Sequence, residues 1–369
     1  MLLQRLILSR AAKVWRKAPG AAVPTVCVGN ITVGGTGKTP HTELILRMLL
    51  ESNRWGNANL AVLSRGYKRK SKGFQIVSPD STASFGGDEP LQIARKFPSV
   101  TVAVDKNRVE GCERLTSGAA GPDAQEAASP SAPEAAAKVP ASDLIVLDDA
   151  FQYKRLHATL NIVLVNYRRP IFEDRLLPFG RLRDLPSRIK EADAVIVTKC
   201  PSVLEDGERE AWRERLRLPQ NMPLWFTTVE YYEPVPVFPD QADTRYNYSK
   251  TAVLFSGIAD DTPLRAHISD TYKIVEVLKF PDHHAFSKGD IGQIAAAVRK
   301  HPTAALLTTE KDAVRVLDCA SVATAGKGKA HRWTVPQEIR ERLFAVPVRA
   351  AFLDSADQEA LQQRLEQLL

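Results

Sequence analysis

The segment Gly29-Asn-Ile-Thr-Val-Gly-Gly-Thr-Gly-Lys-Thr-Pro40 stands between a short apolar run and a helical pattern. We expect Pro24–Gly29 to form a buried strand and Pro40–Leu50 a helix. Closely spaced glycines let successive backbone N–H groups turn inward and surround phosphate oxygens at a helix N-terminus. A glycine-rich loop between a strand and a helix is the context of a Walker A motif, which restricts the fold to α/β proteins with a parallel sheet.

Residues 32–39 of this loop are expected to bind the nucleotide: Thr32, Val33, Gly34, Gly35, Thr36, Gly37, Lys38 and Thr39. Lys38 would reach the β- and γ-phosphates, and the Thr39 hydroxyl would ligate Mg²⁺. The loop departs from the eight-residue Walker A pattern at its first position, where Thr32 replaces glycine.

A second acidic motif, Asp143-Leu-Ile-Val-Leu-Asp148-Asp149, is an apolar run that ends in two carboxylates. Parallel strands bring their carboxyl ends to one edge of the sheet, so these side chains are expected beside the phosphate loop. Either Asp148 or Asp149 can hold the metal, directly or through water. In Thr198-Lys199-Cys200-Pro201, proline stands where a guanine-binding motif has aspartate. The expected nucleotide is therefore ATP.

Strand-like and helix-like segments alternate along the chain, which predicts an α/β fold with a doubly wound, mostly parallel sheet and a second, smaller α/β domain. The predicted divisions are a helix over 1–20, a nucleotide-binding domain over 21–223, hinge strands over 224–248 and a C-terminal domain over 249–369. In the last of these, 346–352 reads as one apolar run. Residues 118–142, rich in Ala, Pro, Ser and Gly, predict a disordered insertion.

The chain is basic, with a formal charge of +7, which favours anionic partners. Its four cysteines lie far apart and predict neither a zinc site nor a disulfide framework. Apolar runs fall short of the roughly 18 residues that span a bilayer. Met1–Lys17 carries five basic residues, no acidic one and apolar residues at helical spacing. This segment fits either an amphipathic helix in a membrane interface or a helix packed on the domain surface.

Several further motifs occur in a fixed order over nearly the whole chain. They are Ser64-Arg-Gly-Tyr67, Gly87-Asp-Glu-Pro90, Asp148-Asp-Ala-Phe-Gln152, Leu177-Pro178 with Gly180-Arg-Leu-Arg-Asp184, Phe280-Pro-Asp-His-His284 and Thr308-Thr-Glu-Lys-Asp312. Together with the phosphate loop, this ordered set resembles the tetraacyldisaccharide 4'-kinase family of lipid A biosynthesis. The chain departs from the family pattern at Ala150, Tyr153, Arg181 and Asp184, which leaves the fine contacts near Tyr153 and Asp184 open.

The resemblance implies an ATP- and Mg²⁺-dependent kinase that phosphorylates the 4'-hydroxyl of tetraacyldisaccharide 1-phosphate and gives lipid IVA. It implies that Asp88 accepts the hydroxyl proton, that His283 pairs with Asp88 and tunes it, and that Lys38 is catalytic. Asp88 and Glu89 are expected in a loop of the first domain, so the pair with His283 would form when the domains close. From the residues alone, without the family resemblance, two alternatives stay open: Asp88 caps a helix, and His283 lies in a surface loop.

The implied substrate-binding residues are Arg65, Glu89, Arg108, Gln152, Arg183 and Asp184. Arginine binds phosphate bidentately and a carboxylate accepts sugar hydroxyls, which suits an anionic disaccharide head group. The implied partners are this acylated lipid and the inner-membrane surface, which the protein would contact peripherally on the cytoplasmic face. The sequence contains no recognisable nucleic-acid-binding module and indicates no obligate protein partner.

The alternative function is a membrane-associated ATPase switch of the partitioning type, whose deviant phosphate loop has a similar Gly-Gly-Thr-Gly-Lys-Thr string. Those proteins carry a signature lysine immediately before the two glycines, where this chain has Val33. Val33 at this position favours the kinase over the ATPase switch. Whether His284 shares the role of His283 is left open.

Overall fold

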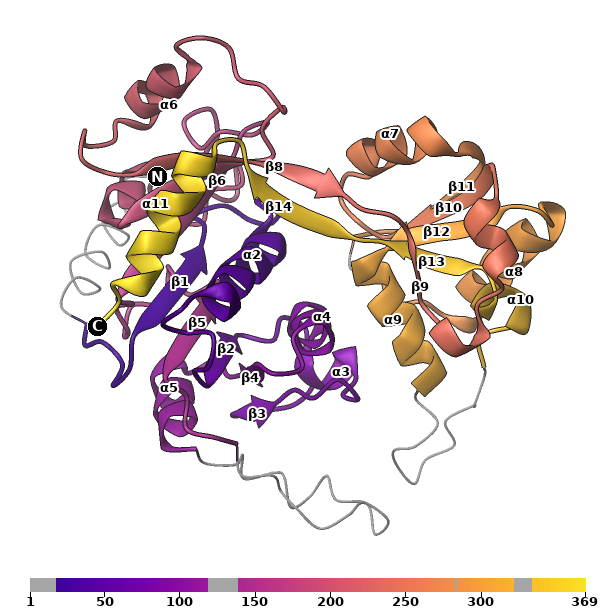
Figure 1. Cartoon of the computed structure of the whole chain (residues 1–369), viewed down its shortest axis with the longest axis horizontal. Coiled ribbons are helices and arrows are strands. Elements are labelled where there is room, and N and C mark those ends of the chain that lie inside the picture. Colours follow the sequence, from indigo (N-terminus) through magenta and orange to yellow (C-terminus); the bar gives the residue numbers. More distant parts are fainter. Residues whose placement is uncertain (1–17, 119–138, 283, 322–333) are drawn as a thin grey trace. The chain divides into compact units, whose positions relative to one another are not determined.

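The structure, a computed structural model, describes residues 18–118, 139–282, 284–321 and 334–369, without the side chains of 319–321. The chain divides into two compact units (Figure 1). The first contains the described residues up to Pro79, Ile93–Glu230 and Arg349–Leu369; the second contains Asp80–Gln92 and Tyr231–Val348. Most of the expected helix over 1–20 and of the insertion over 118–142 lies outside the described residues, as does His283.

The first unit is built on a sheet whose described strands follow the order β14-β8-β7-β6-β1-β5-β2-β4-β3. Neighbours from β8 to β4 pair in parallel, and β3 is antiparallel to β4. The predicted mostly parallel α/β fold is therefore confirmed. The strands are β1 (Thr25–Gly29), β2 (Leu60–Ser64), β3 (Gln75–Ile76), β4 (Thr101–Val104), β5 (Leu144–Asp148), β6 (Leu160–Asn166), β7 (Ala194–Thr198), β8 (Leu224–Tyr231) and β14 (Val348–Phe352).

The register of the central strands sets the position of the phosphate loop. Val28 in β1 lies opposite Asp148 in β5, and Asn166 in β6 lies opposite Thr198 in β7. Strands β1, β5 and β6 are buried along their whole length, as expected for near-continuous apolar runs covered on both faces. The carboxyl ends of these strands consequently meet at one edge of the sheet.

Helix α2 (Lys38–Glu51) begins directly after the phosphate loop and packs on β1 and β5. The C-terminal helix α11 (Ser355–Glu366) lies beside α2 (Figure 1). Trp55 Nε1 donates a hydrogen bond of 2.8 Å to the Leu365 carbonyl, and Leu361 is fully buried. Helices α5 (Arg108–Ser117) and α6 (Glu208–Leu216) and the 3-10 helix η2 (Pro186–Glu191) connect strands of this unit. Between β3 and β4 the chain forms α3 (Ala83–Gly86), which belongs to the second unit, and α4 (Asp88–Lys96), which begins in the second unit and ends in the first. No described helix combines the length and apolar character needed to cross a bilayer.

The second unit has a smaller sheet in the order β11-β10-β12-β13-β9, in which only the β9–β13 pair is antiparallel among the described strands. Its core includes Phe255, Ile294 and Leu306. The strands are β9 (Val235–Pro236), β10 (Thr251–Ser256), β11 (Lys273–Lys279), β12 (Ala305–Thr309) and β13 (Leu343–Val346). The helices are α7 (Thr262–Thr271), α8 (Lys288–Lys300), α9 (Glu310–Ser321) and α10 (Gln337–Arg340), with 3-10 helices η3 (Pro239–Gln241) and η4 (Thr244–Tyr248).

Two segments lie in a different unit from the one expected. Residues 349–369 complete the first unit, because β14 joins β8 and α11 packs on α2. The run expected over 346–352 is interrupted at Pro347, which separates β13 of one sheet from β14 of the other. Residues 80–92 belong to the second unit, where α3 contacts α9. The motif that contains Asp88 therefore does not lie with the phosphate loop in the first unit.

Candidate active site

The phosphate loop occupies the turn between β1 and α2, as its residues predict. Gly34, Gly35 and Gly37 have φ angles of +63°, +75° and +78°. A side chain at these positions would strain the backbone, because L-residues rarely adopt positive φ. Thr36, between the second and third of these glycines, is buried. The glycines are thus required by the path of the chain around the helix N-terminus.

Three consecutive carbonyl groups of this loop accept hydrogen bonds from side chains of other elements. Asn166 Nδ2 donates to the Gly35 carbonyl at 2.8 Å and Thr198 Oγ1 to the Thr36 carbonyl at 2.9 Å. His41 Nδ1 lies 2.7 Å from the Gly37 carbonyl. Within a trans peptide unit the N–H points away from the C=O, so anchoring these oxygens aims the N–H groups of 36–38 to the opposite side. Such a row of N–H groups is an anion-binding arrangement.

Asn30 connects the start of the loop to its far side. Its Nδ2 donates to Thr36 Oγ1 at 2.5 Å, and its Oδ1 accepts from Arg183 Nη2 at 2.5 Å. Asn30 is completely buried. The roles of Asn30, His41, Asn166 and Thr198 were not predicted. Asn166 and Thr198 are the last residues of β6 and β7, so their place at a strand end is the signal that could have identified them.

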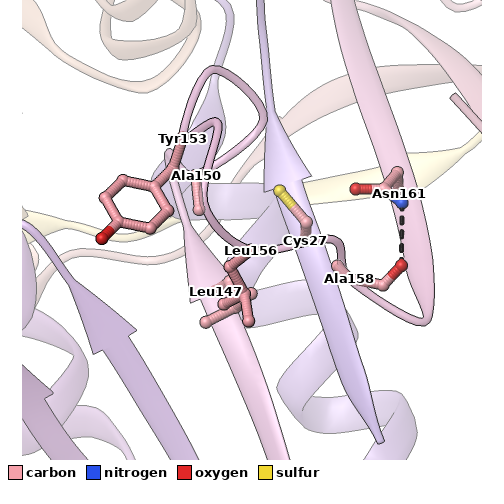
Figure 2. A pocket seen from close by; sticks show the side chains of 7 residues that line it. All are labelled: Cys27, Leu147, Ala150, Tyr153, Leu156, Ala158 and Asn161. Atoms are coloured by element: carbon pink, nitrogen blue, oxygen red, sulfur yellow. Dashed lines mark hydrogen bonds between the residues drawn. The ribbon is translucent and has the colours of Figure 1, made fainter. Parts of the chain in front are cut away.

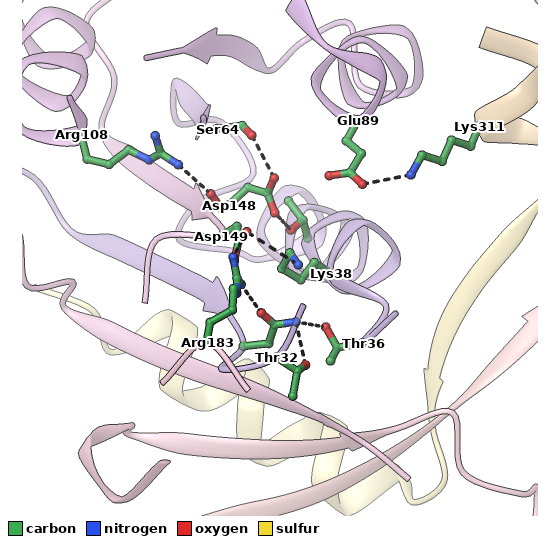
Figure 3. A network of polar contacts seen from close by, with 12 residues as sticks. Thr32, Thr36, Lys38, Ser64, Glu89, Arg108, Asp148, Asp149, Arg183 and Lys311 are labelled. Carbon is green, nitrogen blue, oxygen red and sulfur yellow. Dashed lines mark hydrogen bonds and ion pairs between the residues drawn. The ribbon is translucent and has the colours of Figure 1, made fainter. Parts of the chain in front are cut away.

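The two carboxylates at the end of β5 have different surroundings (Figure 3). Asp148 is buried and accepts from Ser64 Oγ at 3.0 Å and Thr42 Oγ1 at 3.4 Å. Asp149 accepts two hydrogen bonds from Arg183, at 2.8 and 3.2 Å, and lies 3.8 Å from Lys38 Nζ. Burial raises the pKa of Asp149, but Lys38 and Arg183 outweigh it and hold that pKa below its ordinary value. Asp149 is therefore ionised at neutral pH.

The other predicted substrate-binding residues of the first unit differ in exposure. Arg65 is exposed directly after β2. Gln152 is half-buried, and its Nε2 atom has no hydrogen-bond partner among the described residues. Arg108 is buried and donates to the Asp105 carbonyl and, at 3.4 Å, to the Asp148 carbonyl, so it braces the end of β5.

Asp184 is buried and accepts from the Leu185 N–H at 2.8 Å and from Arg188 Nε at 3.3 Å. Arg188 in turn lies over the Phe151 ring, 5.1 Å from its centroid. The structure thus gives Asp184 an anchoring contact, and its contact with a sugar hydroxyl stays a prediction.

In the second unit, Asp88 and Glu89 are the first residues of α4 rather than part of a loop, which corrects the sequence-based expectation. Arg315 donates to Asp88 Oδ2 from Nε at 2.8 Å and from Nη2 at 2.7 Å. Arg315 is itself fixed by Asp312 Oδ1 at 2.7 Å, and Asp312 is completely buried. Lys311 pairs with Glu89 at 3.4 Å (Figure 3). Side chains of α9 thus orient both carboxylates.

His283 lies outside the described residues, so its expected pair with Asp88 remains untested. His284 Nε2 lies 3.0 Å from Asp290 Oδ2, in the first turn of α8, and its ring stacks on Phe280 at 5.2 Å. His284 therefore has a local structural contact.

A narrow pocket lies elsewhere in the first unit (Figure 2). It is lined by Cys27, Leu147, Ala150, Tyr153, Leu156, Ala158 and Asn161. Most of these side chains are apolar and belong to the core, and Asn161 Nδ2 already donates to the Ala158 carbonyl at 3.0 Å. The pocket is therefore part of the core packing and contains none of the predicted site residues.

Because His41 is buried, we expect the free energy of unfolding to depend on pH in the acidic range. Burial lowers its pKa from 6.5 to about 4, so the unfolded chain binds this proton at a higher pH than the folded chain. The free energy of unfolding should therefore fall as the pH falls from 6.5 towards 4, by up to about 3 kcal/mol. Urea titrations at pH 7 and pH 4.5 measure the loss. His41→Gln, which keeps an N–H donor for the Gly37 carbonyl, should show a smaller loss; an equal loss in both proteins contradicts the assignment.

The comparisons with known proteins agree on one family. The family model for tetraacyldisaccharide-1-phosphate 4'-kinase matches residues 1–369. The chain is 39% identical over 336 residues to the tetraacyldisaccharide 4'-kinase of Parabacteroides distasonis, covering 89% of this chain and 81% of that one. It is 36% identical over 347 residues to the enzyme of the same name from Bacteroides thetaiotaomicron, covering 90% and 81%.

Among solved structures, the fold resembles that of LpxK from Aquifex aeolicus, which was determined in complex with ATP. The TM-score is 0.66 at 23% sequence identity, over 99% of this chain and 96% of the other. At this identity the likeness supports the fold, and it extends over both units.

Proposed function

The chain belongs to the tetraacyldisaccharide-1-phosphate 4'-kinase family, and from that membership we infer that it transfers the γ-phosphoryl group of ATP to the 4'-hydroxyl of this disaccharide. This is a step of lipid A biosynthesis, and it makes the chain an ATP-dependent kinase. The observation in this chain that best supports the inference is the anchored phosphate loop, with Lys38 and the ionised Asp149 beside it.

In the proposed mechanism, the N–H groups of residues 36–38 and the Lys38 ammonium bind the phosphate oxygens of ATP. Thr39, together with Asp148 or Asp149, would hold Mg²⁺, since hydroxyl and carboxylate oxygens are the ligands that this hard cation prefers. When bound, Mg²⁺ neutralises charge on the phosphates. The anchored carbonyls keep the loop in place, so little reorganisation is needed as charge develops on the transferred group.

We propose Asp88 as the general base. The 4'-oxygen bonds to the γ-phosphorus, its proton passes to the Asp88 carboxylate, and the bond from that phosphorus to the bridging oxygen of ADP breaks. Arg315 acts as a positioning residue, because its two hydrogen bonds fix Asp88 Oδ2. The pair of Asp88 with His283 stays a prediction. Lys38 belongs to the first unit and Asp88 to the second.

The acceptor head group carries phosphate and hydroxyl groups, which suit arginine and amide side chains. We propose that the exposed Arg65 and the half-buried Gln152 and Arg183 contact it. The unpartnered Nε2 atom of Gln152 is a buried donor that an acceptor oxygen would satisfy. Arg183 already donates to Asn30 and Asp149, and its Nε atom, which has no partner among the described residues, is the donor left for the acceptor. For Glu89, Arg108 and Asp184, which also have protein partners, we propose that they hold the neighbouring groups in place.

An acyl-chain-bearing acceptor remains at a bilayer, and we propose that the protein acts peripherally at the cytoplasmic face of the inner membrane. The basic charge of the chain favours such an anionic surface. Neither nucleic acid nor an obligate protein partner is part of the proposal.

The kinase and the ATPase switch differ in what stimulates ATP turnover. The kinase should consume ATP at an appreciable rate only when tetraacyldisaccharide 1-phosphate is supplied in detergent, because the acceptor hydroxyl is a reactant. The measurement compares ADP release with acceptor, with detergent alone and with vesicles that lack acceptor. Turnover stimulated equally by acceptor-free vesicles would contradict the proposal and support the switch.

A further inference from the structure

The loop between Arg175 and Arg181 presents apolar side chains to solvent. Phe179 is 74% exposed and Leu177 is 42% exposed, with the exposed Pro178 between them. Val33, on the neighbouring phosphate loop, is also exposed and is joined to this loop by a hydrogen bond of 2.8 Å from its N–H to the Arg181 carbonyl. Isolated exposed apolar residues are ordinary, but a group of them on one short loop is a signal of an interaction surface.

Phe179 is exposed on a loop whose conformation is fixed by hydrogen bonds and a close backbone approach. The Leu177 N–H donates to the Leu182 carbonyl at 3.0 Å, and Asp174 Oδ1 accepts from the N–H groups of Arg175 and Arg181 at 2.7 and 3.0 Å. A Cβ atom on Gly180 would lie 2.3 Å from the Arg175 carbonyl, so glycine is needed for this tight path. Leu176 and Leu182 are buried in the core. The loop is therefore held at its base while its tip projects.

The charges around the tip identify the kind of partner. Arg175 and Arg181 flank it in the sequence and are exposed. The two acidic residues that precede the loop have partners: Glu173 pairs with Arg215, and Asp174 accepts from the N–H groups of Arg175 and Arg181. The run 175–183 contains no acidic residue. An apolar, aromatic tip bordered by arginines matches the interface of an anionic bilayer, where rings enter the acyl boundary and guanidinium groups meet phosphates. Three apolar side chains are far too few for a stable protein interface, which buries roughly 800 Å² on each partner.

We propose that the loop 175–181 is a membrane-contact loop that inserts Leu177 and Phe179 into an anionic lipid surface. This inference rests on the proposed function, because membrane contact would serve to reach a lipid acceptor. The loop is also continuous with the candidate active site. The Arg183 N–H donates to the Ile31 carbonyl at 2.8 Å, and the Arg183 side chain pairs with Asp149. Insertion of the tip would therefore place the phosphate loop at the bilayer surface, where the lipid acceptor lies.

The test measures binding of the full chain to vesicles of phosphatidylethanolamine and phosphatidylglycerol. The double variant Leu177→Ser, Phe179→Ser should bind about tenfold more weakly than the wild type, because insertion of two apolar side chains is lost. The matched control is Val203→Ser, which removes an 80% exposed apolar side chain from another loop of the same unit and should bind like the wild type. Equal binding of the double variant and the wild type overturns the proposal.

A second experiment reports the environment of position 179 directly. Its result therefore does not depend on whether other segments of the chain also bind the membrane. Phe179→Cys is labelled with an environment-sensitive fluorophore in a Cys319→Ser background, since Cys27, Cys112 and Cys200 are buried. Added vesicles should shift the emission to the blue, whereas a label at Val203→Cys should not respond. A label at position 179 that stays in water while the protein binds vesicles overturns the proposal.

The activity on a short-chain, water-soluble acceptor separates this inference from the proposed function. The double variant should phosphorylate that acceptor at the wild-type rate, because neither Leu177 nor Phe179 belongs to the proposed chemistry. Equal loss of activity on soluble and membrane-held acceptors would overturn the membrane role of the loop. Failure of the wild type itself to phosphorylate either acceptor would count against the proposed function, while vesicle binding would still decide the role of the loop.

Discussion

Asp88→Asn is expected to lower the rate of phosphoryl transfer about 10³-fold while ATP binding is retained. Asparagine keeps the shape of the side chain and an oxygen that can accept from Arg315, which holds Asp88 Oδ2 at 2.7 and 2.8 Å. It cannot accept the hydroxyl proton at neutral pH. The measurement is kcat with saturating ATP and acceptor, together with the dissociation constant of ATP from calorimetry.

Asp318→Asn is the matched control for this variant. Asp318 lies in α9, and its Oδ2 accepts from the Ala83 N–H in the segment that leads to α4. The control thus removes a carboxylate charge from the same unit without touching the proposed base, and it should stay close to the wild-type rate. A kcat for Asp88→Asn close to that of Asp318→Asn would show that Asp88 is not the base.

Lys38→Ala is expected to lower the rate of transfer about 10²- to 10³-fold and to weaken ATP binding as well. Lys38 is the first residue of α2, and its Nζ lies 3.8 Å from Asp149 Oδ2. Its removal takes a positive charge from the start of α2, directly after the glycine-rich loop, and leaves Asp149 with one cationic partner fewer. Rates and ATP affinity are measured with the same acceptor assay and calorimetry as for Asp88→Asn.

Lys70→Ala removes the same charge from an exposed loop of the first unit and should change neither quantity appreciably. Loss of ATP binding in Lys38→Ala but not in Lys70→Ala would locate the effect at the phosphate loop. If Lys38→Ala retained both the wild-type rate and the wild-type affinity, the assignment of residues 32–39 as the nucleotide site would fail.

The position of the phosphate loop could be predicted because strand, glycines, lysine and helix are adjacent in the sequence. The placement of Asp148 and Asp149 followed from a general property of parallel sheets, that strand ends share an edge. The anchors of the loop could not be predicted in the same way. Asn166 and Thr198 lie 131 and 162 residues from the carbonyls they bind, and which strands neighbour β1 is decided by the packing of the whole sheet.

The sequence was also insufficient where a short segment joins a distant unit. The sequence of α11 does not reveal that this helix packs on α2, with Leu361 and Leu365 buried. The Gly-Gly-Asp-Glu-Pro motif reads as a loop of the first domain, whereas Arg315 and Lys311 hold its carboxylates in the second unit. Charge pairing between residues more than 200 positions apart has no local signature. Arg315 was missed for the same reason.

The most direct test of the central claim follows labelled γ-phosphate from ATP to tetraacyldisaccharide 1-phosphate and to the same acceptor without its 4'-hydroxyl. The account predicts labelled lipid from the wild type with the complete acceptor, none with the 4'-deoxy acceptor, and a large loss with Asp88→Asn. Label on the 4'-deoxy acceptor would contradict the assigned position of transfer. Absence of labelled lipid from the complete acceptor, while the protein still hydrolyses ATP, would contradict the kinase assignment itself.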